Sequence, residues 1–117
     1  MRHRRKRPYE SLYNTFIQKA GKNGHTVTIT YDQFLLLTDI KECHYCGAGV
    51  IWLEYQTRTP GKKYRGQAYN LDRKDSAEPY TFENVAVCCA RCNLAKNNLF
   101  TYEEWKQIGG LIRSWKS

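Results

Sequence analysis

Two short stretches, Cys43-His-Tyr-Cys46 and Cys89-Ala-Arg-Cys92, decide the fold of this chain. Each is a CxxC unit that can place two thiolates on one metal ion from a tight turn. The 42 residues between the two units are more than a minimal zinc ribbon carries, so a substantial insertion must loop out between them. A redox CxxC would need only one such unit. The spacing therefore predicts a closed structural Zn²⁺ site with four cysteine ligands.

The remaining cysteine usage and the lack of targeting signals indicate an intracellular, cytoplasmic protein. The basic residues after Met1 have no hydrophobic segment behind them, as a signal peptide would require. The longest strongly apolar run, 34–37, is far shorter than the roughly 20 residues of a membrane helix. Five cysteines are an odd number, and reducing conditions disfavour disulfides. Cys88 lacks a CxxC partner, and we interpret it as a small buried hydrophobic side chain.

The basic charge is concentrated in two places. The 117 residues carry a net charge of +8, from 19 Lys and Arg against 11 Asp and Glu. We expect residues 1–8 to form a basic disordered arm ahead of one domain, residues 9–117. Such arms bind phosphate backbones by releasing condensed counterions, although a solvated tail is the alternative. The residues predicted to bind nucleic acid in the arm and in a second basic cluster are Arg2, Arg4, Arg5, Lys6, Arg7, Lys62, Lys63 and Arg65.

Hydrophobic spacing and turn residues predict an α+β fold. Capping pairs mark two helix starts, Thr30 with Gln33 and Thr101 with Glu104. Apolar residues recur at helical spacing near both ends of the chain, and short alternating runs indicate strands between them. The expected helices are 8–20, 30–37, 90–98 and one from 101 onward, and the expected strands are 26–30, 50–53, 68–73 and 85–87, the last two as an antiparallel pair.

Three motifs follow one another in the strand, loop, strand, helix order of residues 68–98. They are Asn70-Leu-Asp-Arg-Lys-Asp75, Tyr80-Thr-Phe-Glu-Asn-Val85 and Cys88-Cys-Ala-Arg-Cys-Asn-Leu-Ala-Lys96. With the first CxxC unit they resemble the HNH nuclease superfamily, and more narrowly the phage-type HNH proteins. The resemblance covers roughly 26–106, with a motif core at about 43–98. It implies a small zinc-stabilised domain with a ββα-metal (HNH, His-Me finger) core and flanking N- and C-terminal helices.

The same resemblance implies an activity and its partner. Members of this superfamily are metal-dependent endonucleases, so we expect hydrolysis of phosphodiester bonds in DNA, by nicking or by double-strand cleavage. One metal centre handles one strand, and double-strand cleavage would therefore need a homodimer or two sequential events. A larger phage or host DNA-processing complex is the other assembly we consider, and the resemblance is consistent with a phage-encoded, DNA-associated protein.

The resemblance also assigns roles to individual residues. Asp72 and Asn93 fall where the family holds its catalytic ion, and such oxygen ligands suit Mg²⁺ or Mn²⁺. Asn84 corresponds to the middle Asn of the family name, which braces the loop through backbone hydrogen bonds. Lys96 lies three residues after Asn93, on the same helix face, and is expected to bind a phosphate oxygen of the nucleic acid.

The chain departs from the family at Arg73, where relatives carry the histidine that acts as general base. A guanidinium stays protonated and cannot deprotonate water, although it can stabilise negative charge on a phosphate. Asp75 is a candidate substitute base or additional ligand. None of the histidines, His3, His25 and His44, fits the position easily. Metal-bound hydroxide formed without a base is the remaining route.

This departure leaves two functions open. The joint presence of Asp72, Asn84 and Asn93 favours the endonuclease, while Arg73 favours a catalytically weak or inactive, zinc-stabilised DNA-binding module. A purely structural zinc protein, such as a ribosome-associated module, would explain the cysteines and the charge. It would leave the pattern from Asp72 to Lys96 unexplained, so the endonuclease is the preferred interpretation.

Overall fold

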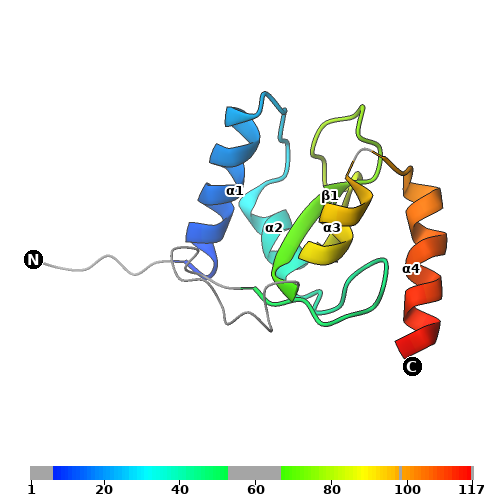
Figure 1. The fold of residues 1–117 in the computed structure, drawn as a ribbon. Coiled ribbons are helices and arrows are strands. Elements are labelled where there is room, and N and C mark those ends of the chain that lie inside the picture. The colour runs from blue at the N-terminus through cyan, green and yellow to red at the C-terminus, as the bar shows by residue number, and fades with distance from the viewer. Residues whose placement is uncertain (1–6, 53–66, 98, 117) are drawn as a thin grey trace, which may run out of the picture.

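The computed structural model of this chain describes residues 7–52, 67–97 and 99–116. In this part of the chain, helices accompany a two-stranded antiparallel sheet, which confirms the predicted α+β class. Figure 1 shows α1 and α2 on one side of the hairpin and α4 on the other, with α3 next to β1. The elements are α1 (Glu10–Lys22), α2 (Tyr31–Thr38), β1 (Tyr69–Arg73), β2 (Val85–Cys89), α3 (Ala90–Lys96) and α4 (Tyr102–Lys116).

Local capping signals set the starts of α2 and α4. Thr30 and Gln33 exchange two hydrogen bonds, of 3.1 Å from Gln33 N to Thr30 Oγ1 and 3.0 Å from Thr30 N to Gln33 Oε1. Thr101 and Glu104 form the same pair of bonds, of 3.1 Å from Glu104 N to Thr101 Oγ1 and 2.8 Å from Thr101 N to Glu104 Oε1. Both predicted capping boxes are therefore confirmed. Each of them satisfies backbone N–H groups that the first helical turn leaves unpaired.

The two strands predicted outside the hairpin are not formed as strands. Val27 makes one parallel bridge to Tyr80, and Ile51 makes one to Ala68. Alternating hydrophobicity predicts a pleated segment, but a strand also needs a partner along its whole length, and each segment here has one bridge. The Val27 bridge is supported by a backbone hydrogen bond, in which Tyr80 N donates to the carbonyl of Thr26 at 2.9 Å. Residue 53 of the second segment lies outside the described residues.

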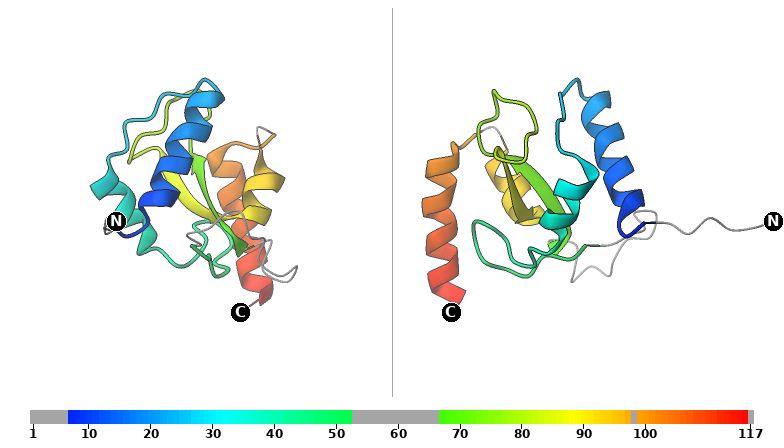
Figure 2. Two further views of the ribbon diagram at one scale, coloured as in Figure 1. Left: turned by 90° about the vertical axis from the view of Figure 1, so that its left-hand side faces the viewer. Right: turned by 180° about the vertical axis from the view of Figure 1, so that it is seen from behind.

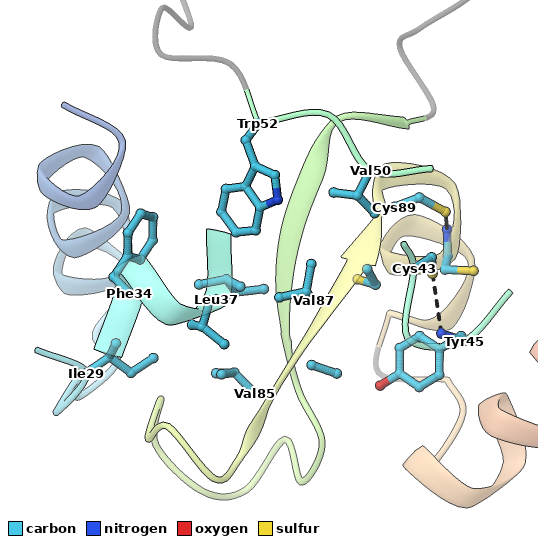
Figure 3. Packing of buried hydrophobic residues seen from close by; sticks show 14 of the residues in the cluster. Ile29, Phe34, Leu37, Cys43, Tyr45, Val50, Trp52, Val85, Val87 and Cys89 are labelled. Atoms are coloured by element: carbon cyan, nitrogen blue, oxygen red, sulfur yellow. Dashed lines mark hydrogen bonds between the residues drawn. The ribbon is translucent and has the colours of Figure 1, made fainter. Parts of the chain in front are cut away.

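The hydrophobic core covers both sides of the hairpin. Figure 3 shows Ile29, Phe34 and Leu37 on the side of α1 and α2, and Cys43 and Tyr45 on the other side. Phe34 of α2 meets the Trp52 ring edge-on at 5.9 Å, and Trp52 stacks on Tyr69 of β1 at 4.4 Å. All five residues of β2 are buried. Cys88 is among them and is fully enclosed, which confirms that it is a buried side chain, and this burial raises the pKa of its thiol.

The hairpin positions α3 directly. In the register of the sheet, Asp72 lies opposite Ala86, and β2 runs without a loop into α3. Cys89 is the N-cap of α3, and its sulfur accepts a hydrogen bond from the backbone of Cys92 at 3.5 Å. The second CxxC unit therefore opens this helix, as predicted. Among the described residues, the helices are too short or too polar to cross a membrane.

Candidate active site

The four cysteines of the two CxxC units meet in one place. Their Sγ atoms all lie within 4.8 Å of one another, an arrangement that could hold a metal ion. The backbone of Tyr45 donates to Cys43 Sγ at 3.4 Å, and that of Cys46 donates to the same sulfur at 3.5 Å. Hydrogen bonds from the thiols of Cys89 and Cys92 lower the pKa of Cys43 far below its usual range. The predicted clustering of these four residues is confirmed.

A buried indole adds independent support for an ion here. Trp105 Nε1 is the one buried side-chain nitrogen or oxygen of the described residues that lacks a hydrogen-bond partner. Hydrogen bonds with Cys43 and Cys89 raise the pKa of Cys92, while the indole of Trp105 acts in the opposite direction. The indole thus lies close to the Cys92 sulfur without full hydrogen-bond geometry. A metal-bound thiolate, being charged, would give this N–H an acceptor.

On the hairpin, Asp72 belongs to a buried polar network. Its Oδ2 accepts a 2.6 Å hydrogen bond from the hydroxyl of Tyr45 and lies 3.2 Å from Lys96 Nζ. The Lys96 side chain is only 2% exposed. Asp72 therefore stabilises the ammonium inside the protein, because a buried charge needs an ionic partner. The Lys96 ammonium does not face outward, as the expected contact with a phosphate would require.

Asn93 lies one turn before Lys96 and is paired with Asn70, a residue to which no role was assigned from the sequence. Asn93 Nδ2 donates to Asn70 Oδ1 at 3.1 Å, which leaves the side-chain oxygen of Asn93 out of this bond. Strand alternation could have indicated Asn70, since residues 70 and 72 share one face of β1. Asn70, Asp72 and Asn93 line a cavity of about 470 Å³ between α1, β1 and α3.

His25 also lines this cavity, although its position in the sequence lies far upstream of the motif core. Its ring contacts Tyr80 edge-on, with centroids 5.6 Å apart. The bridge between Val27 and Tyr80 fixes the segment that carries His25 against the β1–β2 loop. No local sequence signal indicates this approach, because only the long-range pairing of Val27 with Tyr80 creates it.

Arg73 and Asp75 make their contacts within the β1–β2 loop. Arg73 Nη1 donates to the carbonyls of Ser76 and Glu78, at 2.7 and 3.2 Å, and its guanidinium lies over the Tyr80 ring at 5.3 Å. Asp75 Oδ1 accepts a 2.9 Å bond from the backbone of the residue two positions on. Because β1 ends at Arg73, Asp75 lies in the loop and does not share a strand face with Arg73.

Asn84 makes hydrogen bonds of the kind that its expected bracing role requires. Its Oδ1 accepts from the backbone of Asp75 at 3.0 Å. Its Nδ2 donates to the carbonyl of Asp75 at 3.1 Å and to that of Pro79 at 2.9 Å. One side chain thereby holds both ends of the loop that follows β1.

Arg7 is the one residue of the two basic clusters that the described ranges include. It forms a 2.7 Å ion pair with Glu10 and lies over the Tyr31 ring at 4.0 Å. Pro8 also contacts the folded body, since its carbonyl accepts a 2.7 Å bond from the hydroxyl of Tyr31. The predicted nucleic-acid contacts that lie outside the described residues are Arg2, Arg4, Arg5, Lys6, Lys62, Lys63 and Arg65.

With its hairpin, helix and four-cysteine cluster, the chain has a class of fold that a solved HNH endonuclease shares. The rare-cutting HNH restriction endonuclease PacI, described as acting by an extraordinary mechanism of DNA perturbation, has a similar structure. The TM-score is 0.71 at 28% sequence identity, over 92% of this chain and 78% of the PacI chain. No protein-family model and no curated protein matches the chain. The predicted resemblance to the HNH superfamily is confirmed.

Proposed function

We propose that this chain is a metal-dependent HNH endonuclease that hydrolyses phosphodiester bonds in DNA. The observation that carries the proposal is the meeting of Asp72, Asn93 and His25, from three separate segments, at one cavity. The similarity to PacI, an HNH restriction endonuclease, supports nuclease activity. The cysteine cluster would hold Zn²⁺ as a structural ion, which four thiolates suit.

The donor set at the cavity fits a second, catalytic ion. Asp72 offers a carboxylate and Asn93 an amide oxygen, and hard ions such as Mg²⁺ or Mn²⁺ prefer ligands of this kind. When bound, such an ion supplies charge neutralisation and a lowered pKa for bound water. Lys96 and Tyr45 hold the Asp72 carboxylate in place, since both contact its Oδ2. Asn70 orients Asn93 through their shared hydrogen bond.

His25 is the group we propose as general base. An imidazole can accept a proton near neutral pH, whereas the guanidinium of Arg73 cannot. The Tyr80 ring orients the imidazole from one side. In this proposal Arg73 and Asn84 act as positioning residues that hold the β1–β2 loop and, through Tyr80, the imidazole.

The proposal extends to how the chain meets DNA. A single copy would cut one strand, so double-strand cleavage would need a homodimer or a larger DNA-processing complex. Residues 1–8 would act as a basic arm on the phosphate backbone and residues 9–117 as one domain, in an intracellular, DNA-associated protein.

A plasmid-nicking assay with Mg²⁺ or Mn²⁺ tests the function. We expect the zinc-loaded protein to nick supercoiled DNA, and His25→Ala and Asn93→Ala each to slow nicking by about 10²- to 10⁴-fold. His3→Ala is the matched control, since it removes an imidazole from the arm. A folded protein that binds DNA but never nicks it with either ion would instead support the inactive DNA-binding module.

A further inference from the structure

A basic and aromatic surface lies where the first CxxC unit, the β1–β2 loop and the start of α4 meet. Tyr102 of α4 stacks on His44, with centroids 5.7 Å apart and planes at 24°, and its hydroxyl lies 2.8 Å from His44 Nε2. Lys106 Nζ lies 4.9 Å from the centre of the Tyr102 ring and Lys74 Nζ lies 5.6 Å from it. We call these four residues, His44, Lys74, Tyr102 and Lys106, the Tyr102 patch.

Positive charge dominates this patch. Two ammonium groups approach one ring, and the ring's negative face holds them there. Glu103 is the acidic residue paired with one of these groups, with its Oε1 3.8 Å from Lys106 Nζ. The Glu103 side chain is 74% exposed and the Lys106 side chain 45%. An exposed ion pair of this kind contributes little to stability, so a phosphate can displace the Glu103 carboxylate from Lys106. Lys74 has no ion pair to an acidic residue among the described parts of the chain.

The patch is joined to the proposed metal site by one side chain. The Tyr45 ring meets Tyr102 edge-on at 6.0 Å, and the Tyr45 hydroxyl donates to Asp72. Lys74 directly follows Arg73, which lines the cavity. Figure 1 shows the start of α4 on the far side of the hairpin from α1. The cavity runs along β1, and the patch adjoins the end of that strand at Lys74.

We propose that the Tyr102 patch binds a backbone phosphate of the DNA that flanks the cleaved bond; this inference rests on the proposed nuclease function. A phosphodiester carries the charge that two ammonium groups complement, and the Tyr102 hydroxyl adds a hydrogen-bonding group. Three chain segments position these groups before any ligand arrives. A contact of this kind fixes the position of the duplex and reads no sequence.

The salt dependence of DNA binding tests the patch. We would measure the anisotropy of a short fluorescein-labelled duplex with Ca²⁺ in place of Mg²⁺, for the zinc-loaded protein. In the double variant Lys74→Gln with Lys106→Gln, the slope of log K against log salt should become shallower by about 1, because the contact to one phosphate is lost. Arginine at both positions should restore the slope. The charge-matched control, Lys22→Gln with Lys41→Gln, should leave it unchanged.

Each result separates the two proposals. An unchanged slope in a variant that still nicks DNA overturns the patch and leaves the nuclease standing. A shallower slope in a protein that never nicks supports the patch and overturns the nuclease. Equal slope changes in the control pair overturn the patch, since they show a general charge effect. A protein that binds no duplex overturns both proposals.

Discussion

At the scale of single residues, Arg73 serves the loop through contacts that a histidine could not reproduce. Its guanidinium bonds to two carbonyls and lies over Tyr80. We expect Arg73→His to lower the free energy of unfolding by about 2 kcal/mol, since two solvent-exposed hydrogen bonds are lost and each contributes roughly 1 kcal/mol. If His25 is the base, the nicking rate should not rise. Urea unfolding and plasmid nicking measure the two effects.

A matched change separates this outcome from a general effect of losing an arginine. Arg91→His alters an exposed position of α3 and should leave stability within about 0.5 kcal/mol of the original. A nicking rate that rises by about 10²-fold or more in Arg73→His would mean that the base is missing at that position, and that His25 does not supply it.

The buried pair of Lys96 and Asp72 leads to a second prediction. Lys96→Met keeps the apolar stem but leaves the Asp72 carboxylate without its ionic partner. Removing one partner of a buried pair costs about 3 to 5 kcal/mol, so urea unfolding should show a loss of that size. Lys22→Met, at an exposed position of α1, should change stability by less than about 0.5 kcal/mol. Equal stability in the two variants would contradict the ion pair.

At the scale of elements, α4 depends on a close approach to the first CxxC unit. A Cβ atom at Gly109 would lie 2.5 Å from the carbonyl oxygen of Tyr45, so any larger side chain would clash with this backbone. Gly109→Ala should therefore displace α4 and lower the melting temperature. Gly110→Ala is the matched control, because nothing lies within 4 Å of its Cβ. Alanine there should raise stability by up to about 1 kcal/mol, since glycine disfavours helices.

Elements fixed by neighbouring residues could be predicted from the sequence, and those fixed by distant partners could not. The capping boxes at Thr30 and Thr101 and the hairpin of β1 and β2 were predicted correctly, because their signals are local. The predicted strand at 26–30 was wrong, since only Val27 finds a strand partner. The same long-range bridge brings His25 to the cavity, and for that reason no sequence pattern indicated its place there.

At the scale of the whole molecule, two kinds of stabilisation meet at the hairpin. Figure 2 shows α1 and α2 on one side of the hairpin and α4 on the other. Apolar side chains such as Phe34 pack on the side of α1 and α2, and the cysteine cluster lies on the side of α4, which adds Trp105 to the core. The candidate site depends on both halves. His25 comes from the apolar half, while Asn93 is on α3, the helix that Cys89 caps.

Removing the metal should therefore disrupt more than one ligand site. Four thiolates on Zn²⁺ can supply on the order of 10 kcal/mol of folding free energy, comparable with the roughly 5 to 15 kcal/mol of a typical domain. A zinc chelator should unfold the protein, seen as lost near-ultraviolet circular dichroism, and should abolish nicking even with Mg²⁺ present. Zn²⁺ should restore both, whereas further Mg²⁺ should not. Cys88→Ala should still bind one Zn²⁺ per chain, because Cys88 lies outside the cluster. A chelated protein that stays folded would show that the cluster does not stabilise the fold through a metal.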